Sequence, residues 1–140
     1  MGSSGRHTVE TRRGCYVAVF HLAAPHTIRI AKLGRFRFPK GFYLYVGSAQ
    51  GGLEARLRRH GRRRKTPRWH VDYLSSHARM IAAAQIDGPK ERECDMASKL
   101  AETLERPVPG FGSSDCDCMT HLFYTPSFPK LDSLGLDFEQ

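Results

Sequence analysis

Over residues 41–49, apolar side chains alternate with the phenols of Tyr43 and Tyr45. This two-residue period predicts a β-strand with two different faces. Glycines follow the strand and allow the backbone to turn tightly. Leucines then recur four residues apart, which predicts a helix over 52–60 that carries arginine and histidine on another face.

The rest of the chain shows the same two periods. A nearly continuous apolar run over 14–22 predicts a central strand, and alternation on both sides of Gly34 predicts a β-hairpin over 27–38. The later predicted elements are a short helix over 69–77, a strand over 78–86, a helix over 91–104 and a last strand over 119–125.

The pattern predicts one domain, with no internal repeat and no long linker. We expect a disordered N-terminal tail over 1–13, a single domain over 14–125, and a C-terminal tail over 126–140 with a weakly helical end. The interval from Arg62 to Pro67 is expected to be a mobile loop.

Composition narrows the class of protein. No apolar run approaches the roughly 18 residues that a membrane span needs, and the first residues lack the apolar core of a signal peptide. We therefore expect a cytoplasmic protein without a membrane partner, and no obligate protein partner is evident. In that setting the cysteines are expected to be thiols or metal ligands rather than disulfides.

Charge is the strongest bulk signal, because the net charge is +8 and the isoelectric point is about 9.7. One segment has no acidic residue between its cations, which are Arg56, Arg58, Arg59, Arg62, Arg63, Arg64, Lys65 and Arg68. Such a block repels itself unless a partner neutralises it, so it predicts a surface that binds nucleic acid. The alternative is a solvated basic loop that aids solubility.

One set of side chains suggests phosphodiester hydrolysis: Tyr16, Tyr43, Tyr45, Arg56 and His60. That reaction needs an activated water and charge stabilisation on the phosphate. A buried tyrosine can relay a proton, an arginine can bind a phosphate through two hydrogen bonds, and a histidine transfers protons near neutral pH. The alternative is ordinary strand aromatics beside two surface residues of a basic helix.

A carboxylate at the start of the late predicted helix is a second candidate. If Glu93 faces a basic cleft, it can bind Mg²⁺ or Mn²⁺, because magnesium favours one or two carboxylates with water and substrate phosphate. The alternative is capping, since an acid near a helix N-terminus complements the helix dipole.

Two further groups have metal-ligating side chains. Cys116, Cys118 and His121, with Cys94 as a distant fourth ligand, could bind structural zinc, although a hydrogen-bonded loop with free thiols is the simpler interpretation. A helix would point His70 and Asp72 apart. In an extended segment both could face the basic cleft, as a proton relay or as metal ligands.

The signature residues resemble those of a known superfamily. Gly14-Cys15-Tyr16 and Tyr45-Val46-Gly47 are similar to the two halves of the GIY-YIG nuclease signature. Longer blocks resemble the branch of that superfamily that was long catalogued as a domain of unknown function and is sometimes attached to endonuclease III. Those blocks are Phe38-Pro39-Lys40-Gly41, Tyr45-Val46-Gly47-Ser48-Ala49, Trp69-His70-Val71-Asp72-Tyr73-Leu74, Pro109-Gly110-Phe111-Gly112-Ser113-Ser114-Asp115-Cys116 and His121-Leu122-Phe123-Tyr124.

The resemblance implies an α/β (α+β) domain, with a small central antiparallel sheet of three strands flanked by helices. It also implies a one-metal endonuclease that acts on DNA, with DNA repair as the expected setting. Tyr16 and Tyr45 would position or deprotonate the water, Arg56 would stabilise the phosphate, His60 would move protons and Glu93 would hold magnesium.

Two features depart from the superfamily pattern. A hairpin is added between the two signature strands, and the loop that contains Ser114 occupies the region where many members carry an asparagine, which makes Ser114 an additional candidate. The alternatives to a DNA endonuclease are a nucleic-acid-binding module without cleavage, for which RNA is also a suitable ligand, and a zinc-stabilised interaction domain.

Overall fold

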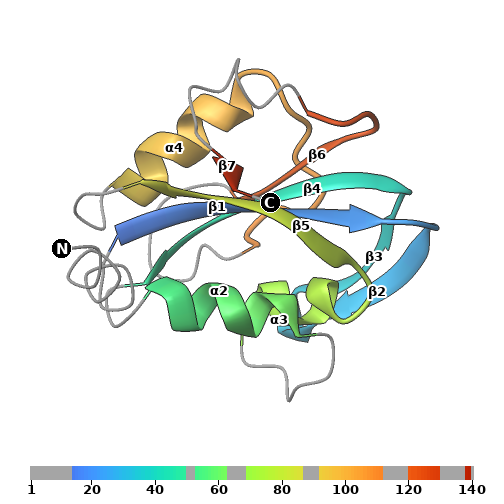
Figure 1. Cartoon of the computed structure of the whole chain (residues 1–140). Helices are drawn as coiled ribbons and strands as arrows, with labels where there is room; N and C mark the ends of the chain where they lie inside the picture. The colour runs from blue at the N-terminus through green and yellow to red at the C-terminus, as the bar shows by residue number, and fades with distance from the viewer. Residues whose placement is uncertain are drawn as a thin grey trace, which may run out of the picture.

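The computed structural model describes residues 14–49, 53–62, 69–86, 92–111, 120–129 and 138–139. Its main sheet has five antiparallel strands in the order β6-β4-β1-β5-β7 (Figure 1). These strands are β1 (Gly14–Leu22), β4 (Gly41–Ala49), β5 (Arg79–Ile86), β6 (Leu122–Thr125) and β7 (Phe138–Glu139). The α+β class expected from the sequence is thereby confirmed.

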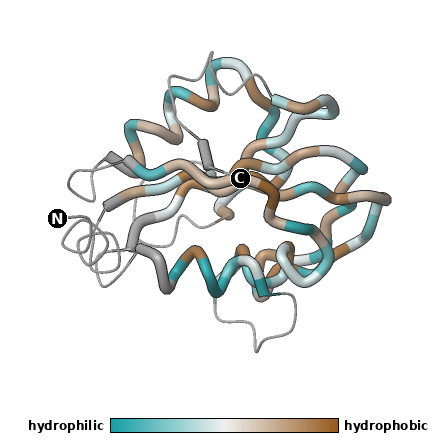
Figure 2. Tube along the Cα trace, viewed as in Figure 1, coloured by the Kyte–Doolittle hydropathy of each residue, from teal (hydrophilic) through white to brown (hydrophobic). Residues whose placement is uncertain are grey.

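Strand β1 lies at the centre of the sheet, between β4 and β5. Alternate side chains of β1 enter two different cores, with Tyr16 and Phe20 on one face and Val17 and Val19 on the other. A strand that is covered on both faces needs apolar residues at nearly every position. This explains the continuous apolar run, which appears as brown tube in the middle of Figure 2.

One face of the sheet is covered by the helix α4 (Arg92–Ala101). Its apolar side chains Met96, Ala97 and Leu100 pack against Val17 and Val46 of the sheet. Their spacing of three and four residues places them on one side of the helix, which is the amphipathic pattern that the sequence predicts there.

The opposite face is covered by α2 (Leu53–Gly61), α3 (His70–Ser75) and a separate two-stranded hairpin (Figure 1). The hairpin consists of β2 (His26–Ile30), a short 3-10 helix η1 (Ala31–Leu33) and β3 (Gly34–Phe38). It buries Ile28, Ile30 and Phe38 in the same core as Tyr16. Gly34 adopts a φ of 116°, a conformation that favours glycine at this turn.

The architecture differs from the sequence-based expectation in two respects. The sheet has five strands rather than three, because β6 adds to β4 and β7 adds to β5 at the two edges. The end of the chain, expected as a loose and weakly helical tail, contains β7, in which Phe138 and Glu139 pair with Ala84 and Ala83. The predicted disordered tail and most of the predicted mobile loop lie outside the described residues.

Candidate active site on the α2 face of the sheet

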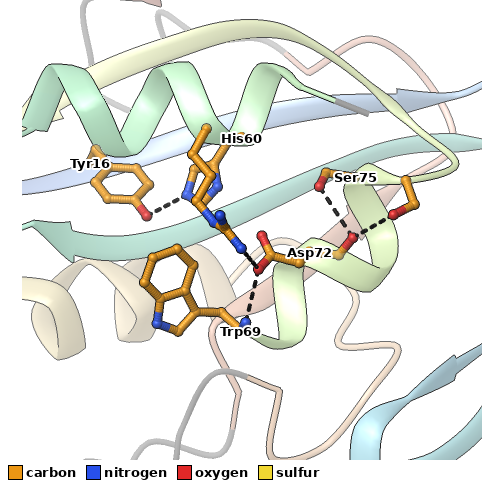
Figure 3. A network of polar contacts seen from close by, with 7 residues as sticks. Tyr16, His60, Trp69, Asp72 and Ser75 are labelled. Carbon is orange, nitrogen blue, oxygen red and sulfur yellow. Dashed lines mark hydrogen bonds and ion pairs between the residues drawn. The ribbon is translucent and has the colours of Figure 1, made fainter. Parts of the chain in front are cut away.

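A buried hydrogen bond joins the first signature strand to α2. Tyr16 Oη lies 2.6 Å from His60 Nε2 (Figure 3). The two residues are 0 % and 1 % exposed, and the rings of Phe20, Tyr45 and Trp69 surround the imidazole. In the tautomer that has its proton on Nδ1, the imidazole accepts the phenolic proton, so this pair can transfer a proton from tyrosine to histidine.

A glycine makes room for the phenol. Gly47 is the β4 partner of Tyr16, and a Cβ atom at this position would lie 2.5 Å from Tyr16 Oη and 2.6 Å from Cζ. No real Cβ atom tolerates such contacts. Position 47 therefore requires glycine, because the ring of Tyr16 lies directly over it.

The two tyrosines of β4 have different environments. Tyr45 lies with its ring centroid 6.2 Å from that of Tyr16 and 5.8 Å from that of His60, so it belongs to the same cluster. The hydroxyl of Tyr43 instead donates a hydrogen bond to the Pro39 carbonyl at 2.5 Å. Burial, with smaller contributions from Tyr124 and Glu105, raises the pKa of Tyr43 well above its ordinary value. Tyr43 is thus held by the backbone of Pro39, and its catalytic role stays a prediction.

Trp69 and two arginines of α2 lie next to the cluster of Tyr16, Tyr45 and His60. The guanidinium carbons of Arg56 and Arg59 lie 4.3 and 4.9 Å from the centroid of the Trp69 ring. Both distances are within the range of cation–π attraction. Arg56 is half-buried. Trp69 contacts both Arg56 and His60, so it connects Arg56 to the Tyr16–His60 pair.

Asp72 connects α3 to α2. Its Oδ2 atom accepts hydrogen bonds from Arg59 Nη2 at 2.8 Å and from the backbone N–H of Trp69 at 3.0 Å (Figure 3). Asp72 is fully buried. The carboxylate therefore caps α3 and forms an ion pair with Arg59. The proton-relay or metal-ligand role of Asp72 and the nucleic-acid contact of Arg59 stay predictions.

His70 does not join Asp72 at a common site. It is half-buried, and its ring meets the ring of Phe111 edge-on, with 5.6 Å between centroids. Burial lowers the pKa of His70 below its ordinary value, which favours the neutral imidazole. The described neighbours of His70 and Asp72 thus differ, and the joint role suggested by the sequence stays a prediction.

Glu93 lies in the first turn of α4, the helix that covers the other face of the sheet. Its side chain is outside the described part of the chain, as are Ser114 and the basic residues Arg63, Arg64, Lys65 and Arg68. Arg58 and Arg62 of the basic run are exposed. The described side chains include no cluster of three or more groups suited to a metal. The assignment of magnesium to Glu93 stays a prediction.

Two of the proposed zinc ligands, Cys94 and His121, have other partners. Cys94 is disulfide-bonded, contrary to the expectation of a thiol, and a sulfur in that state is not a thiolate ligand. His121 is buried, and its Nδ1 atom lies 3.2 Å from the Val46 carbonyl oxygen. Cys116 and Cys118 lie outside the described residues, whereas Cys15 is a buried thiol.

The comparisons define the family. A model of the family described as "Domain of unknown function DUF123" matches residues 15–136. The chain therefore belongs to this family. No curated protein and no solved structure gives a significant match. In the described part of the chain, every helix is too short or too polar to cross a membrane.

Sequence reasoning missed two parts of the site. Trp69 is not among the site residues that the sequence predicts, although it contacts both arginines and His60. The Arg59–Asp72 ion pair joins residues 13 positions apart, a separation that no local periodicity detects. The one available signal was composition, since Trp69 is the chain's single tryptophan.

Proposed function

We propose that the protein is a GIY-YIG-type endonuclease that hydrolyses phosphodiester bonds in DNA with one divalent metal ion. The observation that carries the proposal is the 2.6 Å contact between Tyr16 Oη and His60 Nε2. Two residues from the separate signature regions, 44 positions apart in sequence, form one proton-transfer pair. The DNA repair setting is part of this proposal.

The residues supply the chemistry in the following way. His60 accepts the proton of Tyr16, and the resulting phenolate accepts a proton from the attacking water. The water oxygen then bonds to phosphorus as the P–O bond to the leaving oxygen breaks. The leaving oxygen takes a proton from solvent, and the imidazolium of His60 returns its proton to solvent. Arg56, which lies one helical turn before His60, stabilises the negative charge on the phosphate. Tyr45 orients the pair through its contact with both rings.

Glu93 is the proposed ligand for Mg²⁺ or Mn²⁺. A bound metal would neutralise the phosphate and stabilise the leaving oxygen. This assignment is supported by the resemblance to GIY-YIG nucleases and by the acidic start of α4, where Glu93 and Asp95 follow Arg92. None of the steps assigned to Tyr16, His60 and Arg56 passes through the metal.

The test is cleavage of supercoiled, flapped and branched DNA with Mg²⁺ or Mn²⁺. We expect wild-type protein to cut at least one substrate, and Tyr16→Phe and Glu93→Ala to lose turnover by roughly 100-fold or more, in the range for lost acid–base or charge-stabilising groups. Both variants should still bind DNA. Cleavage that survives in both variants would contradict the proposal.

A non-catalytic nucleic-acid-binding module is the second candidate function. The observation that favours it is the burial of Tyr16 and His60, which are 0 % and 1 % exposed and cannot touch a phosphate in this conformation. Under this alternative, Tyr16→Phe and Glu93→Ala leave every measurable property of DNA binding unchanged and no protein preparation cleaves.

A further inference from the structure

The β2–β3 hairpin carries a large positive charge. Residues 26–40 contain no acidic residue. Their cations are Arg29, Lys32, Arg35, Arg37 and Lys40, and all five are exposed. This segment is separate in sequence from the basic run that begins at Arg56.

The hairpin has one apolar face and one basic face. Ile28, Ile30 and Phe38 are buried in the core beneath the sheet. The residues between them alternate to the other side, because neighbouring side chains of a strand point to opposite faces. Arg29 and Arg35 are Cα partners in the antiparallel pair, so their side chains lie directly opposite each other on the outer face.

Nothing in the described part of the chain neutralises these arginines. The ion pair found there joins Arg59 to Asp72, and Arg29, Arg35 and Arg37 have no acidic partner among the described residues. Like charges placed opposite each other destabilise a β-ladder. The pairing of Arg29 with Arg35 therefore costs stability in the free protein, and an anionic partner that neutralises both charges would remove this cost.

The spacing of the arginines suits a chain of phosphates. Arg35 and Arg37 are two residues apart on one strand, which corresponds to about 6.8 Å at roughly 3.4 Å per residue. Phosphates on one strand of duplex DNA advance by about 3.4 Å along the helix axis. Two cations spaced along one strand can each contact a different phosphate, and a two-stranded ribbon is a known shape for contact with duplex DNA.

The hairpin lies in the same layer as the proposed active site. β2 packs against α3, and α3 packs against α2, all on one face of the main sheet (Figure 1). A duplex that reaches α2 therefore approaches the side of the sheet on which the hairpin lies.

We propose that the outer face of the β2–β3 hairpin, formed by Arg29, Arg35 and Arg37, binds the phosphate backbone of duplex DNA as a second docking surface. This inference rests on the proposed function, because it assigns a role in substrate binding. It makes a flanking duplex arm part of the preferred substrate.

The experiment measures DNA binding without divalent metal, by fluorescence anisotropy on a labelled duplex and on a single strand of the same length, over a range of salt concentrations. The test variant is Arg29→Gln/Arg35→Gln/Arg37→Gln. The matched control is Arg79→Gln/Lys99→Gln/Arg106→Gln, which removes the same charge from exposed positions outside the hairpin.

We expect the hairpin variant to bind the duplex more than tenfold more weakly at low salt. The slope of log affinity against log salt should fall by almost 3, at about 0.9 for each lost phosphate contact. The control variant should keep a slope close to that of wild type. Thermal unfolding of the hairpin variant should occur at an unchanged or higher temperature, because the substitutions relieve repulsion.

Equal slopes for the two triple variants would overturn the hairpin surface and leave the proposed endonuclease standing. A loss confined to the single strand would overturn the assignment to a duplex. Wild-type protein that binds no DNA at low salt would overturn both proposals. If the hairpin variant loses duplex binding but wild type never cleaves DNA, the hairpin inference holds and the endonuclease proposal fails.

Discussion

At the scale of single residues, the site depends on the contact between Tyr16 and the backbone of Gly47. Gly47→Ala would place a Cβ atom 2.5 Å from the phenolic oxygen, so the ring must move and its bond to His60 must lengthen or break. Overpacking of this kind costs about 1–3 kcal/mol. We expect urea unfolding to show a loss of about 2 kcal/mol, together with loss of any activity that depends on the pair.

Gly61→Ala is the matched control for that substitution. A Cβ atom at Gly61 would meet Met80 Cε at 3.7 Å, an ordinary van der Waals contact. Its free energy of unfolding should be unchanged or slightly higher, because alanine loses less backbone entropy than glycine on folding. Equal stability of the two variants would show that Tyr16 adapts without cost.

Tyr43 gives a prediction for alkaline pH. Burial raises its folded-state pKa well above the unfolded value of 10.0, and the pKa of Tyr124 is raised in the same way. The unfolded chain therefore releases these protons first, so stability is complete below pH 10 and falls as the pH rises above it. The tyrosinate absorbance that comes from Tyr43 and Tyr124 should appear together with unfolding rather than before it.

Tyr43→Phe tests this assignment. The variant loses the hydrogen bond to Pro39, at about 1 kcal/mol near neutral pH, yet its stability should fall less steeply above pH 10 than that of wild type. A wild-type titration in which every tyrosine ionises before any loss of folded structure would contradict the assignment.

The residue types of the site could be predicted from sequence, whereas their pairings could not. The alternation that places Tyr43 and Tyr45 on one face is local, and the structure confirms it. Their different environments depend on Pro39, Tyr124 and the returning helix α2, which are tertiary contacts. The Arg59–Asp72 ion pair is likewise a tertiary contact, so the sequence pattern around Asp72 does not predict it.

At the scale of elements, the Arg59–Asp72 pair holds α3 against α2. Breaking a buried pair from one side leaves an uncompensated charge and costs about 3–5 kcal/mol. Arg59 keeps 19 % of its side chain exposed, which reduces that cost. We therefore expect Asp72→Asn to lower the free energy of unfolding by about 2–3 kcal/mol in urea.

A double-mutant cycle isolates the ion pair. Asp72→Asn/Arg59→Gln should lose less stability than the two single variants added together, because each single change already removes the attraction. Additive losses would show that the pair contributes little and that Asp72 acts through its cap on Trp69 alone.

Most element positions followed from local pattern. The bounds of β1 and β4 coincide with the predicted strands, α2 differs from prediction by one residue at each end, and β5 differs by one residue at its start. The number of strands in the sheet could not be predicted from local pattern. β6 and β7 join the edges of the sheet through pairing between distant segments. β7 has two residues, too few to show a period.

At the scale of the whole molecule, charge is divided between the two layers that cover the sheet. Residues 26–40, which include the hairpin, have basic but no acidic side chains. Residues 91–105, which include α4, have five acidic and two basic side chains. A field of this shape attracts a polyanion to the α2 and hairpin side.

We predict that wild-type binding to duplex DNA weakens steeply with salt. If Arg29, Arg35, Arg37, Arg58 and Arg62 each neutralise one phosphate, the slope of log affinity against log salt is about −4.5. Equilibrium binding over a range of salt concentrations measures it. A flat dependence would contradict the assignment of these exposed cations to phosphate contacts.

The central position of β1 also has a consequence for the order in which the protein folds. Its ladder to β5 joins residues such as His21 and Arg79, or Cys15 and Ile86, which are far apart in the order of synthesis. In the growing chain, the backbone groups of β1 that face β5 therefore stay unpaired until β5 emerges from the ribosome. Such distant pairing slows folding, and the open strand is a template for association with other chains, so β1 is where we expect chaperones to bind the nascent protein.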